Sequence, residues 1–518
     1  MNRRTMLGQL DHPEPWDVII VGGGATGLGC AIDAASRGYH TLLLERGDFA
    51  QGTSSRSTKL AHGGVRYLQR GDIALVTEAL HERGLMRRNA AHLVHDRQFV
   101  VPNYDWWEAP FYGVGLKVYD LLAGKLGFGA SQVLSREETV ERLPNIETAG
   151  LRGGVLYFDG QFDDARLAVD MAKTAADQGA AVLNYCNVTE LTRERDLITG
   201  VVAHDEESGA DFALSARAVV NATGVFSDAL RRIDAPDALP IIRASQGVHI
   251  VLDADFLPGD SAIMVPHTDD GRVLFAIPWL GKVVVGTTDT PRDEIEADPR
   301  PLPEEIEFLL RHCARYMTRD PEPADVRSAF AGLRPLVGRA GDASTAAISR
   351  DHDVSISRSG LVTVAGGKWT TYRRMAEDTI NQACLVGGLA DAPCVTADLN
   401  IHGNHRHAER FGALARYGSD AIELRALIGR DPALGARLHP DHEYVLGEVA
   451  WAAREEMART VGDVLARRTR LLLLDAAASI EAAPTVATCL AAELGRDDAW
   501  VAAQVQEYSS RARGYCVT

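Results

Sequence analysis

The 518-residue sequence has no long apolar run and no excess of positive charge, and each absence excludes a class of protein. No stretch approaches the roughly 20 apolar residues that a membrane-spanning helix needs. The formal net charge of -17 argues against nucleic acid as a partner, because phosphate backbones are bound by basic surfaces. A local basic pocket for a small anion is still allowed, since overall charge and site charge are separate quantities.

Paired cysteines and ligand motifs are also missing. The seven cysteines are scattered and form no C-x-x-C pair. An odd number at irregular spacing is typical of reduced thiols in a cytosolic protein. There is no haem or iron–sulfur pattern, and the start, MNRRTMLGQLDHPEPWD, lacks the apolar segment of a signal peptide. We therefore expect a cytoplasmic protein without a metal site that does not cross a membrane.

The most informative stretch that is present is DVIIVGGGATGLGCAIDAASRGYHTLLLE, Asp17 to Glu45. A buried strand, the spacing G-x-G-x-x-G at Gly22, Gly24 and Gly27, an alanine-rich helix and a second strand follow in order. These glycines permit the tight turn, the close approach of a pyrophosphate and close helix packing. The helix N-terminus offers N–H groups to phosphates, and Glu45 can accept hydrogen bonds from ribose hydroxyls. The pattern predicts a Rossmann-like dinucleotide-binding unit.

The polar segment that follows favours FAD over NAD as the dinucleotide. ERGDFAQGTSSRSTKLAHGG, residues 45–64, is not another strand–helix unit. Its hydroxyl and backbone groups suit the part of an extended FAD beyond the AMP half, and the alternative is a solvated loop. The expected cofactor contacts in this segment are Thr53, Ser54, Ser55, Ser57, His62, Gly63 and Gly64.

Motifs along most of the chain resemble those of the FAD-dependent glycerol-3-phosphate dehydrogenases, the aerobic, quinone-linked type. In family order they are TSSRSTKLAHGGVRYL, YFDGQFDDARL, VVNATGVFSD, GVHIVL, AIPWLGKVVVGTTDT, FAGLRPLV, AISRDH and VAGGKWTTYRRMAED. Glycerol-3-phosphate oxidases share much of this pattern. The resemblance implies non-covalent FAD, with further contacts at Gly224, Gly367, Lys368, Thr370 and Thr371.

The resemblance also implies a reaction. The secondary alcohol of sn-glycerol 3-phosphate would be oxidised to dihydroxyacetone phosphate, with the C2 hydrogen leaving as a hydride to FAD N5. A guanidinium group can donate two parallel hydrogen bonds to phosphate oxygens. We therefore expect Arg66, Arg334 and Arg350 to bind the substrate phosphate, with a further hydrogen bond from Tyr67. The alternative for any single arginine is a surface salt bridge.

The hydroxyl proton of the substrate needs a base. His249 is the first candidate because imidazole titrates near neutral pH, and the alternative is a histidine packed in a strand. Lys368 is the second candidate; it would otherwise bind substrate or stabilise negative charge on the reduced flavin. We expect His249, Lys368 and Arg334 to form the catalytic set.

The electron acceptor implied by the resemblance is a membrane quinone. The nearest alternative is an oxidase that uses O2 and releases H2O2. A flavoenzyme acting on an amino or hydroxy acid and a catalytically inactive, FAD-stabilised interaction protein are more distant alternatives. The resemblance also implies peripheral association with the inner face of the cell membrane, and we expect a homodimer.

One segment is a candidate for membrane contact. Asp105–Gly129 combines lysines with aromatic residues, a pattern typical of a helix that lies in the headgroup region, and it is too short to span a bilayer. A buried core or dimer helix is the alternative. ARRTRLLLLDA, Ala466–Ala476, is a weaker second candidate. The aromatic residues of the first candidate are Trp106, Trp107, Phe111, Tyr112 and Tyr119.

The order of the elements predicts an α/β protein, α+β overall, with three domains. A discontinuous FAD-binding domain of the glutathione-reductase and glycine-oxidase type is expected from residues 1–80, 151–235 and 331–400. Dense strand patterns predict an antiparallel-sheet domain that binds substrate and faces the membrane, from residues 81–150 and 236–330. Helical periodicity with charged faces predicts a helical domain over residues 401–518.

Overall fold

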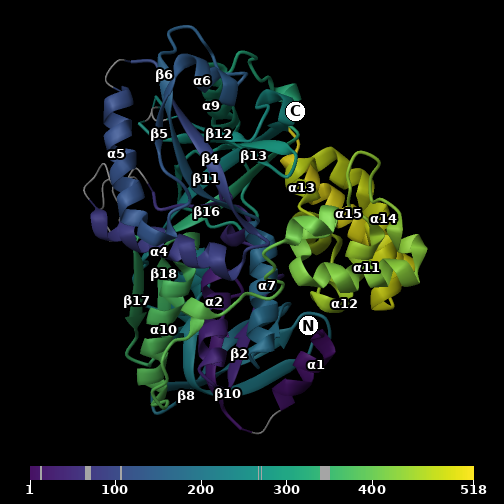
Figure 1. The fold of residues 1–518 in the computed structure, drawn as a ribbon. Coiled ribbons are helices and arrows are strands. Elements are labelled where there is room, and N and C mark those ends of the chain that lie inside the picture. Colours follow the sequence, from purple (N-terminus) through teal and green to yellow (C-terminus); the bar gives the residue numbers. More distant parts are fainter. Residues whose placement is uncertain are drawn as a thin grey trace.

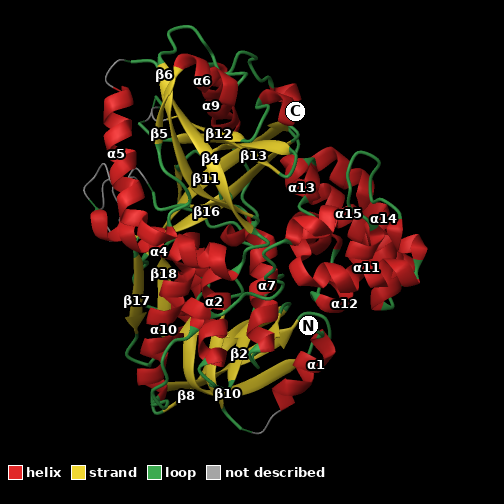
Figure 2. Ribbon diagram, in the orientation of Figure 1, coloured by secondary structure: helices red, strands yellow, loops and turns green. Residues whose placement is uncertain are grey.

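The computed structural model describes residues 1–11, 14–64, 72–105, 108–265, 268–269, 271–338 and 351–517. The chain forms two sheets and a helical C-terminal region (Figures 1 and 2). One sheet lies in the lower part of the view and the other in the upper part, with the C-terminal helices to the right. Within the described ranges no helix is long and apolar enough to cross a membrane.

The first sheet is parallel except at one edge. Its order is β17-β18-β10-β1-β2-β7, with β17 antiparallel to β18, and β8 and β9 continue from β10 as an antiparallel extension. Its strands come from separate stretches of the chain, as a discontinuous dinucleotide-binding unit requires. They are β1 (Trp16–Val21), β2 (Thr41–Leu44), β7 (Ala181–Leu183), β8 (Cys186–Glu194), β9 (Leu197–Asp205), β10 (Asp211–Asn221), β17 (His352–Ile356) and β18 (Val362–Gly366).

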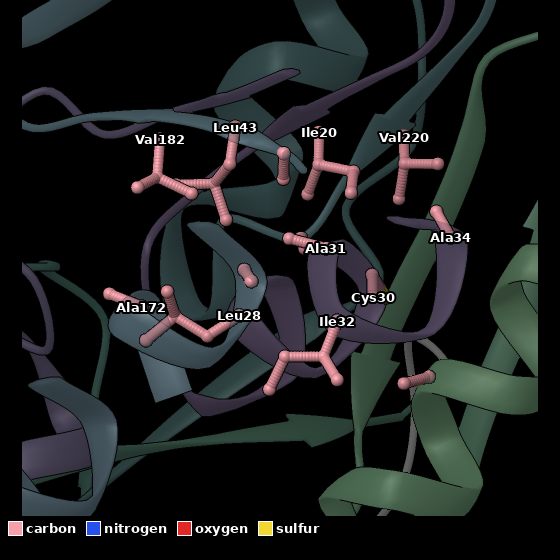
Figure 3. Close-up of a cluster of buried hydrophobic side chains, with 14 of the residues drawn as sticks. Ile20, Leu28, Cys30, Ala31, Ile32, Ala34, Leu43, Ala172, Val182 and Val220 are labelled. Atoms are coloured by element: carbon pink, nitrogen blue, oxygen red, sulfur yellow. The ribbon is translucent and has the colours of Figure 1, made fainter. Parts of the chain in front are cut away.

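Three helices cover one face of this sheet: α2 (Ala25–Ser36), α7 (Asp164–Asp177) and α10 (Tyr372–Gly387). Figure 3 shows how aliphatic side chains of the strands, among them Ile20 and Leu43, meet Leu28 of α2 and Ala172 of α7. All four are fully buried. Burying one large aliphatic side chain stabilises the fold by about 1.5–3 kcal/mol, so this layer fixes α2 against the strands. The small residues of α2 allow that close packing.

The second sheet has the order β15-β11-β14-β13-β12-β4-β6-β3, with β16 paired to β11 and β5 to β6. We expected it to be antiparallel, but β12 pairs parallel with β4, so the sheet is mixed. The physical reason is that these two strands are far apart in sequence, and no tight turn between them imposes an antiparallel pair. The strands are β3 (Leu60–Ala61), β4 (Val94–Asn103), β5 (Gln132–Ser135), β6 (Gly153–Phe162), β11 (Ile242–Asp253), β12 (Ser261–Val265), β13 (Leu274–Trp279), β14 (Lys282–Gly286), β15 (Thr290–Arg292) and β16 (Ser328–Val337).

The domain boundaries drawn from the sequence stay predictions. β3 and β6 lie in ranges assigned to the FAD-binding domain, yet they pair within the second sheet. Helices that flank the two sheets are α1 (Arg3–Gly8), α4 (Ile73–Asn89), α5 (Glu108–Ala123), α6 (Arg136–Arg142), α8 (Ser227–Asp234) and α9 (Pro303–Ala314).

Between Ala408 and Tyr515 every named element that the structure describes is helical. The segment Ala466–Ala476, considered above for membrane contact, is buried: Leu471–Leu474 are at most 3% exposed. That interpretation was wrong, because these leucines fill the core between the C-terminal helices and Phe330 of β16. The main helices here are α11 (Ala421–Arg430), α12 (Leu446–Glu455), the π-helical turn Asp463–Arg468, α13 (Leu471–Leu474), α14 (Ala476–Leu494) and α15 (Asp498–Ala512).

Candidate active site

The end of β1 and the start of α2 form a cradle of backbone that only glycine permits. Gly22 has φ +113°, and a Cβ there would lie 2.6 Å from the Ala222 carbonyl oxygen. A Cβ on Gly27 would lie 1.8 Å from the Gly22 carbonyl oxygen. Gly24 is the N-cap residue of α2, so the N–H groups of the first helical turn, which have no acceptor within the helix, lie at the cradle. This shape fits the pyrophosphate of a dinucleotide.

Glu45 follows β2 and lies directly beside the cradle. Its two carboxylate oxygens accept hydrogen bonds from the N–H groups of Gly23 at 2.6 Å and Gly47 at 2.8 Å. Burial raises the pKa of the Glu45 carboxyl above its usual value. An acceptor held at the end of the second strand fits the ribose-binding role predicted for it.

The segment after Glu45 connects the cradle to two distant parts of the chain. Ser54 Oγ accepts a hydrogen bond from Ala25 N–H at 2.9 Å, and the Ser54 carbonyl oxygen accepts one from Trp369 Nε1 at 2.8 Å. Thr53 Oγ1 donates to the Leu333 carbonyl oxygen at 2.6 Å. The predicted cofactor-binding segment therefore touches α2, β16 and the turn after β18.

The turn after β18 also meets the end of the polar segment. His62 N–H donates to Thr370 Oγ1 at 3.2 Å. Gly367 has φ +74°, so the chain turns sharply before Lys368, whose carbonyl oxygen accepts from Thr371 Oγ1 at 3.3 Å. Residues predicted to contact the flavin from positions 62 and 367–371 are thus brought together.

Three further glycines predicted at the cofactor occupy special positions. Gly63 N–H donates to the Tyr119 hydroxyl at 2.8 Å. Gly64 has φ +81° and Gly224 has φ +60°, and both are in the left-handed region that favours glycine. A Cβ on Gly224 would meet no atom within 4 Å, so conformation and not space selects glycine there.

Two predicted cofactor contacts have other partners in the structure. The N–H and the hydroxyl of Ser57 both donate to Asp164, at 3.0 and 2.7 Å. The carbonyl oxygen of Ser55 accepts from Lys59 Nζ and Arg470 Nη2, each at 2.8 Å. Their role toward FAD stays a prediction, and these bonds give the segment a second set of constraints.

The second sheet brings His249 and Arg334 close together on one face. Gly247 and His249 are two residues apart on β11, so they point to the same side. The Arg334 guanidinium crosses that side, with Nη2 2.3 Å from where a Cβ of Gly247 would be. Its Nη2 donates to Thr287 Oγ1 at 3.1 Å, and its Nη1 lies 3.4 Å from Asp289 Oδ1.

His249 is almost completely buried in a mixed apolar and cationic environment. Its Nε2 lies 2.9 Å from Thr58 Oγ1, and its ring stacks on Phe330 with centroids 4.9 Å apart. Its Nδ1 is buried and has no hydrogen-bond partner among the residues that the structure describes. Burial lowers the pKa of His249 well below 6.5, and Lys59 and Arg334 lower it further. A neutral imidazole of this kind can accept a proton.

Three of the residues predicted to bind the substrate phosphate, Arg66, Tyr67 and Arg350, lie outside the described residues. Their convergence with Arg334 stays a prediction.

No group of three His, Cys, Asp or Glu side chains in the described part of the chain is arranged to hold a metal ion.

Sequence reasoning missed one buried cation beside His249. Lys59 has no exposed surface, and its Nζ donates to Asp164 Oδ2 at 2.6 Å and lies 5.2 Å from the centre of the Phe330 ring. Burial lowers the pKa of Lys59 to about 7. Lys59 lies in the S-T-K-L motif, which could have drawn attention to it. A lysine in a polar segment is, however, normally expected to be exposed.

Known families and proteins match this chain along most of its length. Residues 17–373 match the family model for FAD dependent oxidoreductases, and residues 362–501 match the C-terminal domain of alpha-glycerophosphate oxidase. The chain is 41% identical to the mitochondrial glycerol-3-phosphate dehydrogenase of Homo sapiens, covering 96% of this chain and 73% of that protein.

Two solved structures show how far the likeness extends. The glycerol-3-phosphate dehydrogenase from Bacillus halodurans complexed with FAD superposes with a TM-score of 0.81 at 29% identity, covering 99% of this chain and 97% of that one. The FAD-bound L-alpha-glycerophosphate oxidase from Mycoplasma pneumoniae gives 0.58 at 18% identity, covering 75% of this chain and 99% of that one. The second comparison is a likeness of fold alone.

Proposed function

The chain belongs to the family of FAD-dependent glycerol-3-phosphate dehydrogenases, and on this premise we propose that it passes the electrons of sn-glycerol 3-phosphate to a membrane quinone. The predicted family, FAD as the cofactor, and an oxidoreductase acting on a CH–OH group are confirmed by these matches. The acceptor, the membrane association and the residue roles go further and are proposals. FAD is proposed to be bound non-covalently.

The observation that carries the proposed chemistry is the neutral, buried His249 beside Arg334. When bound, FAD supplies the acceptor for the hydride that leaves C2 of the substrate. The bond between His249 Nε2 and Thr58 Oγ1 allows the tautomer in which Nε2–H donates to the hydroxyl. In that tautomer the lone pair of Nδ1 accepts the proton of the C2 hydroxyl. Arg334 binds the substrate phosphate from the same sheet face. Lys368 would stabilise negative charge on the flavin ring of the bound FAD.

The remaining phosphate contacts are proposed for Arg66, Tyr67 and Arg350. Each lies in a motif of the family that adjoins a described segment in sequence: residues 61–64 for Arg66 and Tyr67, and β17 for Arg350. A cluster of guanidinium groups would explain how a protein with a net charge of -17 binds a dianion.

The helix α5 supports contact with a membrane surface. Phe111, Val114, Val118 and Leu121 are 38–80% exposed, and their spacing of three and four residues places them along one face. The opposite face is buried through side chains such as Tyr112 and Leu116. The helix therefore has one face that packs in a core and one exposed apolar face that suits a membrane surface. Trp106 and Trp107 lie outside the described residues.

The surroundings of α5 favour an anionic bilayer as the occupant of this apolar face. Directly after the helix, residues 126–128 line a hollow together with Arg87, Arg88, Arg406 and Asp96, in which Arg87 pairs with Asp96 at 2.6 Å and Arg88 with Asp398 at 2.7 Å. Guanidinium groups beside an exposed apolar stripe suit anionic headgroups above acyl chains.

The first experiment is an anaerobic visible spectrum of the purified holoprotein before and after adding glycerol 3-phosphate. Bleaching of the oxidised flavin band is the expected result. Adding a quinone analogue should then restore the band quickly, whereas air should restore it only slowly, with H2O2 released at that same slow rate. Fast reoxidation by air with stoichiometric H2O2 would instead assign the oxidase function, and a spectrum that ignores the substrate would refute the proposed chemistry.

Membrane contact is tested by cosedimentation with vesicles of phosphatidylglycerol and phosphatidylcholine. Leu121→Ser, on the exposed stripe, should reduce vesicle binding, whereas Leu385→Ser should not, because Leu385 is 74% exposed on a different helix, α10. Mass photometry of the same variants tests the predicted homodimer. Loss of the dimer in Leu121→Ser with unchanged vesicle binding would make the stripe a subunit contact.

A further inference from the structure

A side chain of the C-terminal helical region reaches the interior of the site. Arg470 precedes α13 and is fully buried. Its Nη2 donates to Asp164 Oδ1 at 2.7 Å and to the Ser55 carbonyl oxygen at 2.8 Å. Its Nε lies 3.3 Å from Asp163 Oδ1. A residue from the last fifth of the chain thus contacts both the start of α7 and the 55–59 segment.

Asp164 passes this contact on to the 55–59 segment. Its Oδ1 is held by Arg470, while its Oδ2 accepts three hydrogen bonds: from Lys59 Nζ at 2.6 Å, from Ser57 Oγ at 2.7 Å and from Ser57 N–H at 3.0 Å. Two cations and the two carboxylates of Asp163 and Asp164 form a buried cluster of balanced charge. The orientation of one carboxylate therefore fixes the residues on both sides of Thr58.

The backbone at both cations is also unusual. Lys59 has φ +64° and Arg470 has φ +66°, in the left-handed region that a side chain with Cβ rarely adopts. Such conformations persist when the surrounding contacts hold them. Here the contacts are those of the cluster, so loss of Arg470 removes part of what holds the 55–59 segment in place.

We propose that Arg470 is a positioning residue for proton transfer: through Asp164 and the Ser55 carbonyl it fixes the segment whose Thr58 hydroxyl holds the His249 ring. This gives the C-terminal helical region a direct part in the oxidation site. The proposal rests on the proposed function for the role of His249. Arg470 itself touches neither substrate nor cofactor in this scheme, so its effect reaches the reaction only through Thr58.

The test compares Arg470→Met with Arg467→Met. Arg467 is a matched control because it is buried in the same segment and is also paired with two carboxylates, Asp48 and Asp463. Among the described residues these carboxylates are its hydrogen-bond partners, and neither lies in residues 55–59. Anaerobic stopped-flow reduction by glycerol 3-phosphate should be about 10-fold slower in Arg470→Met, since misplacement of a reacting group lowers rate steeply. Substrate affinity and FAD content should stay the same, and Arg467→Met should reduce at the normal rate.

Coupling between Arg470 and Thr58 separates positioning from general destabilisation. Thr58→Val should slow flavin reduction by itself, and adding Arg470→Met should slow it little more, because both act through one path. The effects of Thr58→Val and Arg467→Met should simply multiply. Arg470→Lys, which keeps a cation, should recover part of the rate and provides a folded variant if Arg470→Met is unstable. Multiplicative effects of Arg470→Met and Thr58→Val would overturn the proposal.

Hydrogen exchange tests the placement without using the reaction. The N–H groups of Ser57 and Lys59 are bonded to Asp164 Oδ2 and Ser57 Oγ. Exchange of a peptide covering residues 55–62 should be faster in the holoprotein of Arg470→Met and unchanged in Arg467→Met. Unchanged exchange in both would refute the inference. If the natural protein is not reduced by glycerol 3-phosphate, the proposed function fails, but this exchange result still decides whether Arg470 holds the segment.

Discussion

The substitution Gly27→Ala tests how closely α2 must pack against the cradle. The new Cβ would lie 1.8 Å from the Gly22 carbonyl oxygen, and 3.0 Å from the Gly22 carbonyl carbon. Both are backbone atoms, so no rotamer change relieves the overlap, and α2 has to move away from β1. Overpacking a core costs about 1–3 kcal/mol when side chains can adjust. Because they cannot here, we expect a loss of about 3 kcal/mol or more in the free energy of unfolding.

Gly24→Ala is the matched comparison for Gly27→Ala. Gly24 has φ -81° and ψ -178°, which any residue adopts, and its Cβ would meet only Ser54 Oγ at 3.1 Å. We expect Gly24→Ala to fold with nearly normal stability but to bind FAD weakly, since a side chain there obstructs the pyrophosphate. Urea unfolding and the flavin-to-protein absorbance ratio measure the two effects. A Gly27→Ala protein with normal stability and full FAD content would refute this account of the cradle.

The other predictions concern the proposed chemistry. His249→Ala should lower the rate of flavin reduction about 10²- to 10⁴-fold in stopped-flow experiments, and a normal rate would transfer the base role to Lys368. Since a base acts when neutral and the pKa of His249 lies well below 6.5, the rate should be lost only as pH falls below 6.5. Lys59→Met removes a neighbouring cation, so it should raise that pKa and move the acid limb of the pH profile to higher pH; an unmoved limb would contradict this electrostatic coupling. Arg334→Met should raise KM for glycerol 3-phosphate about 10- to 100-fold, and steady-state kinetics with an unchanged KM would remove it from the phosphate site.

The nucleotide cradle could be predicted from the sequence because its parts are consecutive. Gly22, Gly24, Gly27 and Glu45 lie within one strand–helix–strand unit, where spacing alone fixes which groups face the ligand. The helical C-terminal region could also be predicted from the sequence, because helical periodicity is a local signal. The family and its cofactor followed from motifs that keep their order along the chain.

Pairings between distant segments carried no such local signal. Nothing near Ala262 or Phe99 indicates that their strands run parallel, so the second sheet was expected to be antiparallel throughout. The leucines of Ala466–Ala476 suggested a surface for lipid, yet they lie in a core. An apolar run specifies that it must be covered, but only packing decides what covers it.

The sequence by itself determined that this chain binds FAD, that its family oxidises glycerol 3-phosphate, and which glycines shape the nucleotide site. Only the tertiary structure decided that Lys59, Asp164 and Arg470 meet in one buried cluster beside His249. The physical reason is that a buried charge is stable only with its partners, and these partners lie more than a hundred and more than four hundred positions from Lys59 along the chain. In the sequence each of these residues would be expected to be an exposed charge. In the folded protein all three are buried and hold one another in place.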